Sequence, residues 1–257
     1  MNKFNLNFIC NELIDTFFEA GEKSIFLRNK GLKTEYKVDN TPVSNGDTEV
    51  NKLLIKKIET LTSNLPIVSE ESSNNKNNNN LENFWLIDPI DGTYDYINGG
   101  SEFTLNAALI LNKRPELGVI YAPAKKRMFY TYGVGDCYER NRNDIIKLDC
   151  SKKTKLGQIK AIHYSDNLKP VIKDLYKKYG VTEHQRMKSS LKFCVIASSE
   201  YDIYITEPRA SEWDIAAGHA ILKNAGGIIT DFDNKEILYG KQNFKNPSLI
   251  LKRSNIL

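Results

Sequence analysis

Cysteine and histidine are scarce in this chain, which has four cysteines and three histidines among 257 residues. The cysteines form no C-x-x-C pair and stand far apart, at Cys10, Cys137, Cys150 and Cys194. The histidines form no H-x-x-x-H pair and stand at His163, His184 and His219. These absences argue against a disulfide framework and against a zinc site of the usual ligand spacing. We therefore expect a reduced, cytoplasmic protein.

Long apolar runs are also missing, since no stretch approaches the roughly 18–20 apolar residues that a membrane span needs. Residues 1–20 carry charges within their apolar stretch, which predicts an amphipathic helix and not a signal peptide. The net charge is only +4, because 36 lysines and arginines oppose 32 aspartates and glutamates. This balance gives no support for nucleic acid as a partner. We expect no stable membrane insertion, and at most a peripheral association with the inner membrane.

The composition that remains, with 40% apolar and 26% charged residues, is that of a globular protein and excludes a disordered chain. Apolar residues recur at helical spacing from Phe4 to Ala20, and Gly21 is the predicted stop. A second amphipathic helix is predicted to begin at Asp47 or Thr48, either of which can serve as its N-cap. Its apolar stripe comprises Val50, Leu54, Ile58 and Leu61.

The middle of the chain predicts an antiparallel sheet. A short strand at Ile67–Ser69 precedes five strand patterns separated by turns: Phe84–Ile87, Phe103–Leu111, Leu117–Tyr121, Arg127–Tyr132 and Cys137–Arg140. From Ile159 onward, short apolar strands alternate with helical patterns, one of them near Leu168–Tyr179, which predicts an α/β half. We place a soft boundary near residue 156, between an N-terminal α+β part (1–156) and a C-terminal α/β part (157–257).

Residues 72–80, with the sequence SSNNKNNNN, form a low-complexity segment with nothing to bury. Such a composition predicts a mobile surface loop. Base-composition bias in the coding sequence can also produce asparagine tracts of this kind. We therefore attach little functional meaning to the segment at this stage.

An apolar strand pattern leads directly into the sequence Asp88-Pro89-Ile90-Asp91-Gly92-Thr93. Pro89 interrupts regular strand pairing, which leaves the carbonyl group of Ile90 unpaired. Gly92 and Thr93 can begin a helix whose backbone N–H groups face an anion. Two carboxylates, a free carbonyl and an anion cradle together suit a hard cation and a phosphate group. The alternative is that Asp88 and Asp91 are ordinary turn residues.

Two further acidic segments are less informative by themselves. Glu70 and Glu71 follow the predicted strand Ile67–Ser69, where charged pairs are usually solvated surface. Asp214 opens a helical pattern, where the helix dipole favours a carboxylate.

Taken together, the three segments resemble the inositol monophosphatase superfamily of lithium-sensitive, metal-dependent phosphatases. The motifs that carry the resemblance are S-E-E-S at 69–72, D-P-I-D-G-T at 88–93 and W-D-I-A-A-G at 213–218. Their order and separations also match, and the resemblance extends from Lys37 to about Pro247. It implies a layered αβαβα fold of the sugar-phosphatase type.

Within the superfamily, the chain is most similar to the CysQ-type 3′(2′),5′-bisphosphate nucleotidases. Residues 37–47, 102–110 and 189–194 (SSLKFC) carry this closer match, and so does the W-D-I-A-A-G-H-A run. Two positions depart from the pattern. Glu212 stands where an apolar residue is usual, and Tyr94-Asp95-Tyr96-Ile97 replaces K-E-F-I and so loses a lysine beside the site.

The resemblance implies a metal site and a catalytic group. Glu70, Asp88, Asp91, Asp214 and the carbonyl of Ile90 are the implied ligands of two or three Mg²⁺ ions. The charges agree, because about four carboxylates in one pocket cannot all stay ionised without compensation. Thr93 and Glu70 are the implied pair that orients the attacking water. Asp47 is the implied acidic residue that assists them, although its local sequence equally supports the N-cap role.

The implied substrate contacts are the backbone amides of Gly92 and Thr93 for the scissile phosphate. Ser189, Ser190 and Lys192 are the implied contacts for a second phosphate, with a serine cap and an exposed lysine as the alternative. The expected activity is hydrolysis of the 3′-phosphate of adenosine 3′,5′-bisphosphate to AMP and phosphate. The alternative is an inositol or other sugar-phosphate phosphatase of the same fold. The expected partner is a small phosphate ester, and the protein is either a monomer or a homodimer.

Overall fold

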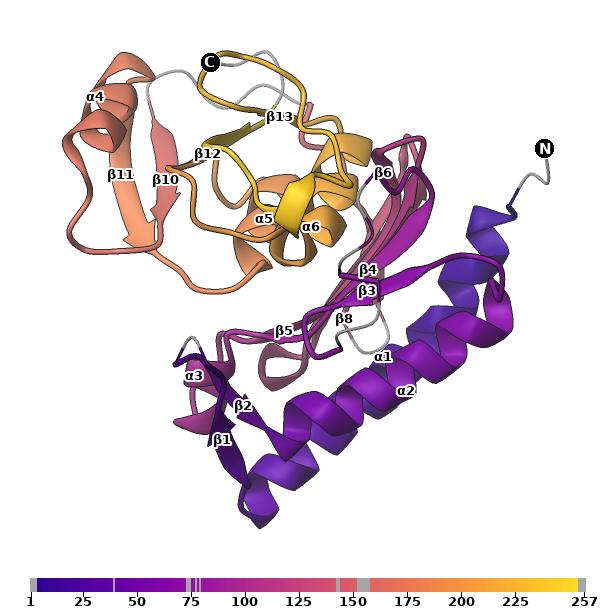
Figure 1. Cartoon of the computed structure of the whole chain (residues 1–257). Coiled ribbons are helices and arrows are strands. Elements are labelled where there is room, and N and C mark those ends of the chain that lie inside the picture. Colours follow the sequence, from indigo (N-terminus) through magenta and orange to yellow (C-terminus); the bar gives the residue numbers. More distant parts are fainter. Residues whose placement is uncertain are drawn as a thin grey trace.

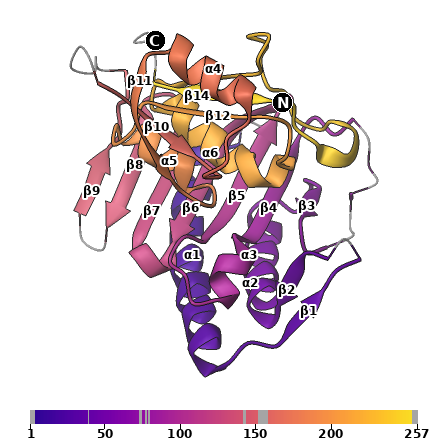
Figure 2. The ribbon, with the colours of Figure 1, turned by 90° about the vertical axis from the view of Figure 1, so that its left-hand side faces the viewer.

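The computed structural model describes residues 4–38, 40–72, 75–76, 78, 80–141, 144–151 and 158–253. The N-terminal half is built around a seven-stranded sheet with the strand order β3-β4-β5-β6-β7-β8-β9. Only β3 and β4 run parallel, and the other neighbours form an antiparallel meander that can be followed strand by strand in Figure 2. The strands are β3 (Ile67–Ser69), β4 (Phe84–Asp91), β5 (Thr104–Leu111), β6 (Arg114–Ala122), β7 (Arg127–Gly133), β8 (Asp136–Asn141) and β9 (Asp144–Lys147).

The C-terminal half contains a five-stranded sheet with the order β11-β10-β12-β14-β13. Its members are β10 (Ile159–His163), β11 (Val181–Arg186), β12 (Ile203–Thr206), β13 (Ile228–Thr230) and β14 (Leu249–Lys252). Strands β10, β11 and β12 pair in parallel, whereas β14 pairs antiparallel with both β12 and β13. The sheet is therefore mixed. Its parallel part agrees with the α/β pattern of the sequence.

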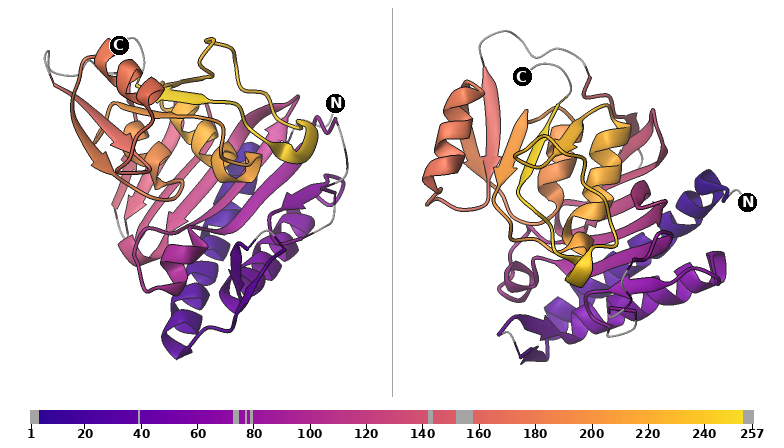
Figure 3. Two further views of the ribbon diagram at one scale, coloured as in Figure 1. Left: turned by 60° about the vertical axis from the view of Figure 1, so that its left-hand side comes forward. Right: turned by 45° about the horizontal axis from the view of Figure 1, so that its top comes forward.

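Helices and sheets alternate in five layers (Figure 1). Helices α1 (Leu6–Lys30) and α2 (Asn45–Leu61) cover one face of the large sheet. Helices α5 (Leu191–Ala197) and α6 (Glu212–Asn224) lie between the two sheets, and α4 (Pro170–Lys178) covers the outer face of the smaller sheet (Figure 3). The predicted αβαβα layering is confirmed. The remaining elements are β1 (Thr34–Tyr36), β2 (Pro42–Ser44), α3 (Thr93–Ile97), and the short 3₁₀ turns η1 (Pro123–Lys125) and η2 (Gln242–Phe244).

Strand β4 shows why the large sheet is covered on both faces. Trp85 and Ile87 join the core beneath α1 and α2, whereas Phe84 and Leu86 join the core beneath α5 and α6. Side chains alternate between the faces of a strand, so an uninterrupted apolar run is buried on both sides. The core between the two sheets draws residues from both sides of position 156, which itself lies outside the described residues.

Helix α1 does not stop at Gly21 as predicted but continues to Lys30. A Cβ atom at position 21 would lie 2.2 Å from Cε1 of Tyr121, whose ring packs edge-on against Phe18 with centroids 5.1 Å apart. Glycine is therefore needed here because the helix approaches β6 closely. Its usual role as a helix stop does not apply.

Two further predicted boundaries need correction. The predicted turn at residues 112–115 consists only of Asn112 and Lys113, both with positive φ, and β6 already begins at Arg114. Strand β4 does not end at Ile87 but reaches Asp91 through a register shift between Asp88 and Asp91. Pro89 and Ile90 lie in that irregularity, where a missing N–H donor is tolerated.

Candidate active site

Three carboxylates from separate parts of the chain meet at one edge of the large sheet. Glu70 directly follows β3, Asp88 lies in β4, and Asp214 lies in the first turn of α6. Each offers an oxygen atom within 4.8 Å of the other two. The parallel pairing of β3 and β4 sets Ser69 opposite Ile87, and so brings Glu70 beside Asp88. The three were predicted as metal ligands from the sequence, and the structure brings them together.

Asp88 is the most buried of these carboxylates, with 1% of its surface exposed. Its Oδ1 atom has no hydrogen-bond partner among the described residues. Burial raises the pKa of Asp88 well above its usual value, and the charges of Glu70, Asp91 and Asp214 raise that pKa further. The pKa of Asp214 is raised in the same way, first by burial and then by the charge of Asp91. A buried oxygen without a donor, among like charges, fits a bound cation, and an all-oxygen donor set fits a hard one.

Asp91 stands at the end of β4 and is held by Ser190. The Ser190 hydroxyl lies 2.6 Å from Asp91 Oδ2 and 2.6 Å from the carbonyl oxygen of Asp214, and it accepts a hydrogen bond from Asn106. The sequence predicts Ser190 as a contact for a second phosphate. In the structure its hydroxyl joins two acidic segments from different halves of the chain, and its surface is 2% exposed.

The bulged end of β4 also brings Thr93 to Asp47. The Thr93 hydroxyl lies 3.0 Å from Asp47 Oδ1 and 3.0 Å from the carbonyl oxygen of Ile90. Gly92, whose φ is 93°, makes the turn from β4 into α3, so the predicted helix start at this point is confirmed. The Ile90 carbonyl was predicted to be unpaired, but in the structure it lies within hydrogen-bonding distance of the Thr93 hydroxyl.

Asp47 is not the N-cap of α2, and neither is Thr48. The N-cap is Ser44, and Asp47 occupies the third helical position, where its Oδ2 accepts hydrogen bonds from the Ser44 backbone N–H (2.8 Å) and hydroxyl (2.6 Å). This reciprocal arrangement is a capping box. Burial raises the pKa of Asp47, and the hydrogen bonds from Ser44 and Thr93 oppose that shift. Asp214 has the corresponding position in α6, because its Oδ2 accepts from the backbone N–H of Ser211 at 2.7 Å.

Lys37 is a site residue that the candidate set lacked. Its Nζ lies 3.1 Å from Oε1 of Glu70 and 2.6 Å from Oε1 of Glu71. The residue lies between β1 and β2, which the strand patterns did not predict because β1 is fully exposed. The only available signal was the position of Lys37 at the start of the 37–47 motif.

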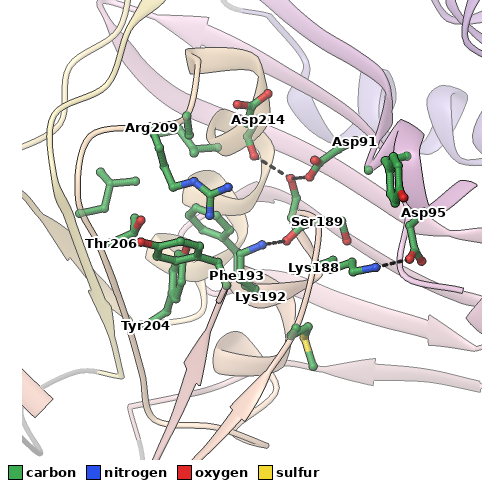
Figure 4. A pocket seen from close by; sticks show the side chains of 18 residues that line it. Asp91, Asp95, Lys188, Ser189, Lys192, Phe193, Tyr204, Thr206, Arg209 and Asp214 are labelled. Atoms are coloured by element: carbon green, nitrogen blue, oxygen red, sulfur yellow. Dashed lines mark hydrogen bonds and ion pairs between the residues drawn. The ribbon is translucent and has the colours of Figure 1, made fainter. Parts of the chain in front are cut away.

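A pocket of about 300 Å³ adjoins the carboxylates, with Asp91, Asp214, Gly92, Ser189, Ser190 and Lys192 in its wall (Figure 4). All six of these residues were predicted from the sequence as metal ligands or phosphate contacts. The Lys192 ammonium donates to the carbonyl oxygen of Ser189 and lies 5.5 Å from the centre of the Tyr204 ring. Burial lowers the pKa of Lys192 to about 8, although the charge of Asp91 opposes the shift.

Arg209 is a second cation in this pocket, and no sequence pattern singled it out. Its guanidinium carbon lies 4.0 Å from the centre of the Tyr164 ring (Figure 4). Tyr164 in turn donates its hydroxyl hydrogen to Glu207. Arg209 lies in the loop before α6, where neither periodicity nor spacing marks it. Only the fold brings it to the same pocket as Lys192.

Both departures from the family motifs have a structural explanation. Glu212 is fully buried, and its carboxylate accepts hydrogen bonds from the backbone N–H groups of Gly240 (2.8 Å) and Lys241 (2.9 Å). It therefore fixes a loop and does not disturb the site. Asp95 forms an ion pair with Lys188, which lines the pocket and brings a lysine to the region where the motif lacks one.

The comparisons with known proteins agree with this geometry. The model of the inositol monophosphatase family matches residues 9–255. The chain is 34% identical over 235 residues to the 3′(2′),5′-bisphosphate nucleotidase CysQ of Salmonella typhimurium, covering 89% of this chain and 93% of that protein. It is 30% identical over 253 residues to the CysQ nucleotidase of Buchnera aphidicola, covering 93% of each.

Solved structures show the same fold. CysQ from Bacteroides thetaiotaomicron superposes with a TM-score of 0.76 at 26% identity, covering 96% of this chain and 97% of that chain. An IMPase/NADP phosphatase complexed with Mg²⁺ and phosphate superposes with a TM-score of 0.77 at 19% identity, covering 97% and 92%. No helix among the described residues is long and apolar enough to cross a membrane. By its sequence, its layered architecture and its cluster of acidic residues, the chain belongs to the inositol monophosphatase family.

Proposed function

We propose that this protein is a Mg²⁺-dependent phosphomonoesterase that hydrolyses the 3′-phosphate of adenosine 3′,5′-bisphosphate to AMP and phosphate. The observation that carries the proposal is one continuous site with two parts of opposite charge. The buried carboxylate cluster with its unpaired Asp88 oxygen adjoins a pocket that holds Lys192 and Arg209. The nucleotidase names of the relatives at 30% and 34% identity support the same substrate.

Glu70, Asp88, Asp91, Asp214 and the carbonyl of Ile90 are the proposed ligands of two or three Mg²⁺ ions. Their oxygens come from β4, from the segment that follows β3 and from the first turn of α6, so regular elements of the fold hold them before any ion binds. When bound, the ions supply compensation for the carboxylate charges, a water of lowered pKa and stabilisation of the leaving oxygen. Ser190 keeps Asp91 turned toward the site through its 2.6 Å hydrogen bond.

Thr93, Asp47 and Glu70 are the proposed groups that orient the attacking water. The Thr93 hydroxyl donates its hydrogen to Asp47 Oδ1, which leaves a lone pair on the Thr93 oxygen to accept a hydrogen bond from water. The Asp47 carboxylate is held by the Ser44 hydroxyl. It can therefore accept the Thr93 hydroxyl proton as Thr93 takes a proton from the attacking water. The backbone N–H groups of Gly92 and Thr93 are the proposed donors to the scissile phosphate.

Lys192 and Arg209 are the proposed contacts for the 5′-phosphate, together with Ser189. A half-buried ammonium with a lowered pKa gains from an anionic partner, because the anion compensates the cost of burial. An arginine is suited to phosphate by its planar set of donors. An inositol monophosphate offers no second phosphate to these residues.

The test is a set of phosphate esters assayed with Mg²⁺ for the wild type and Lys192→Ala. Loss of a charge-assisted contact should lower kcat/KM for adenosine 3′,5′-bisphosphate by about 10- to 150-fold, the equivalent of about 1.5–3 kcal/mol. Inositol 1-phosphate should be hydrolysed more slowly by the wild type and should be nearly insensitive to the substitution. Equal impairment of both substrates, or a preference for inositol 1-phosphate, would replace the nucleotidase with an inositol phosphatase.

The pH dependence gives a second criterion. Lys192 is cationic below its pKa of about 8 and neutral above it. For the wild type, kcat/KM with the bisphosphate should therefore fall as the pH rises through about 8. This fall should be absent from Lys192→Ala.

A further inference from the structure

The asparagine segment, residues 72–80, is not explained by the proposed chemistry. Residues 73, 74, 77 and 79 lie outside the described part. Among the described residues of the segment, Asn75, Lys76 and Asn78 form specific contacts. Asn75 has a φ of 63° and donates from Nδ2 to the carbonyl oxygen of Ile67 at 2.9 Å. Asn78 returns to Asn75 through a backbone hydrogen bond of 3.0 Å. Asparagine tolerates the left-handed conformation, so this turn has a structural reason to contain it.

This turn carries Lys76 to the carboxylate cluster. The Lys76 Nζ donates to the backbone carbonyl oxygen of Glu70 at 2.5 Å and lies 5.1 Å from the centre of the Trp213 ring. Trp213 directly precedes Asp214, and the oxygens of Glu70 and Asp214 lie within 4.8 Å of each other. The Lys76 side chain therefore contacts the backbone of Glu70 in the first half of the chain and Trp213, the neighbour of Asp214, in the second half.

We propose that Lys76 is a positioning residue of the metal site, an inference that rests on the proposed metal-dependent function. It fixes the main chain of Glu70 and keeps it against Trp213, so that the Glu70 and Asp214 carboxylates remain within reach of the same cation. Groups that orient metal ligands commonly change metal affinity by roughly 10–100-fold when they are removed. A cation over an indole ring adds a further attraction.

The comparison with Lys37 shows why Lys76 suits this role. Lys37 contacts the Glu70 carboxylate itself, so its ion pair competes with a metal ion for that carboxylate. Lys76 contacts the carbonyl group, so its hydrogen bond persists when the carboxylate binds an ion. Its positive charge nevertheless repels a divalent cation. Positioning and repulsion predict opposite changes in affinity on removal of the charge, and the sign of the change distinguishes them.

The test is Mg²⁺ binding to Lys76→Met, followed by the change in tryptophan fluorescence without substrate. Methionine keeps the length and apolar packing of the side chain and removes only the ammonium group. We expect the dissociation constant for Mg²⁺ to rise about tenfold, with recovery in Lys76→Arg. The matched control is Lys52→Met, which removes a surface lysine paired with Glu49 on α2 and should bind Mg²⁺ like the wild type. Unchanged or tighter binding by Lys76→Met would overturn the proposal.

A measurement on the metal-free protein gives an independent readout. Loss of Lys76 should make Trp213 more accessible, and quenching of its fluorescence by acrylamide should increase in Lys76→Met but not in Lys52→Met. Trp85 is fully buried and contributes the same background to both variants. Unchanged quenching contradicts the contact with Trp213. Failure of the wild type itself to bind Mg²⁺ would instead overturn the proposed function, so the two failures are distinguishable.

Discussion

Burial and four neighbouring carboxylates, those of Glu70, Asp91, Asp214 and Asp47, all oppose the ionisation of Asp88. A carboxyl group whose pKa is raised by folding stabilises the fold while it is protonated. That stabilisation is lost as the pH rises through the raised pKa. In the metal-free protein the negative charge of Asp88 is therefore destabilising, and increasingly so as the pH rises above the ordinary pKa of an aspartate. The same charge makes it a ligand.

The substitution Asp88→Asn separates these two effects. In EDTA at pH 8 the variant should melt at a higher temperature than the wild type, and the difference should shrink as the pH falls below the raised pKa toward the ordinary pKa of an aspartate. Added Mg²⁺ should raise the Tm of the wild type but hardly that of the variant, and turnover should be almost abolished. Thermal denaturation with and without Mg²⁺ measures all three. A variant that is less stable than the wild type in EDTA at pH 8 would contradict the electrostatic account.

Asp47 poses a different question, since it serves both a helix start and the proposed catalytic group. Asp47→Asn keeps one carbonyl oxygen for Ser44 but removes the charge, so turnover should fall by roughly 10²–10⁴ with a small change in stability. Ser44→Ala is the matched control, because it removes the cap and leaves the carboxylate. It should lower the stability by about 1 kcal/mol. Its turnover should fall much less than that of Asp47→Asn. Similar activity of Asp47→Asn and the wild type would limit Asp47 to its helical role.

At the scale of elements, the contact between α1 and β6 depends on the absence of a side chain at position 21. Gly21→Ala gains roughly 1 kcal/mol of helix propensity but places a methyl group 2.2 Å from the Tyr121 ring. Overpacking of this kind costs about 1–3 kcal/mol, and Tyr121 is 7% exposed and has little room to move. We therefore expect a net loss of stability in chemical denaturation.

The double variant Gly21→Ala with Tyr121→Leu checks this explanation. A smaller side chain at position 121 should relieve the collision, so the two changes together should cost less than the sum of their separate effects. Additive losses would assign the effect of Gly21→Ala to some other cause.

At the scale of the whole molecule, the two halves share a core and an active site. The apolar cluster between the sheets includes Leu86 and Phe129 from the first half and Phe193 and Ile221 from the second. Glu70 and Asp88 meet Asp214 across the same division. We therefore expect a single unfolding transition in calorimetry, shifted upward as a unit by Mg²⁺. Two separated transitions, of which Mg²⁺ moves only one, would indicate that the parts 1–156 and 157–257 are independent domains.

The sequence predicts the features that repeat or that follow from local chemistry. Local signals in the sequence mark the apolar strands, the helical stripe of Val50 and Leu54, and the interruption at Pro89. The acidic motifs indicate which carboxylates lie together in the structure. Gly21 misleads because the collision it avoids involves Tyr121, 100 residues away in the chain. Lys76 and Arg209 reach the site only through tertiary structure, so no spacing in the sequence could identify them. Lys37 had only its position at the start of the 37–47 motif as a signal.

The two capping boxes have a consequence for the entropy of the site. The Oδ2 atoms of Asp47 and Asp214 each accept a hydrogen bond from the backbone N–H of their own helix cap, so formation of α2 and α6 already fixes the rotation of both carboxylates. Ordering a free side chain costs up to about 1–2 kcal/mol. Here the side-chain entropy is lost during folding, so binding of an ion or of the substrate does not lose it a second time. Formation of the first helical turns and orientation of the two carboxylates are therefore one event. Fraying of the first turn of either helix should abolish activity before the protein unfolds.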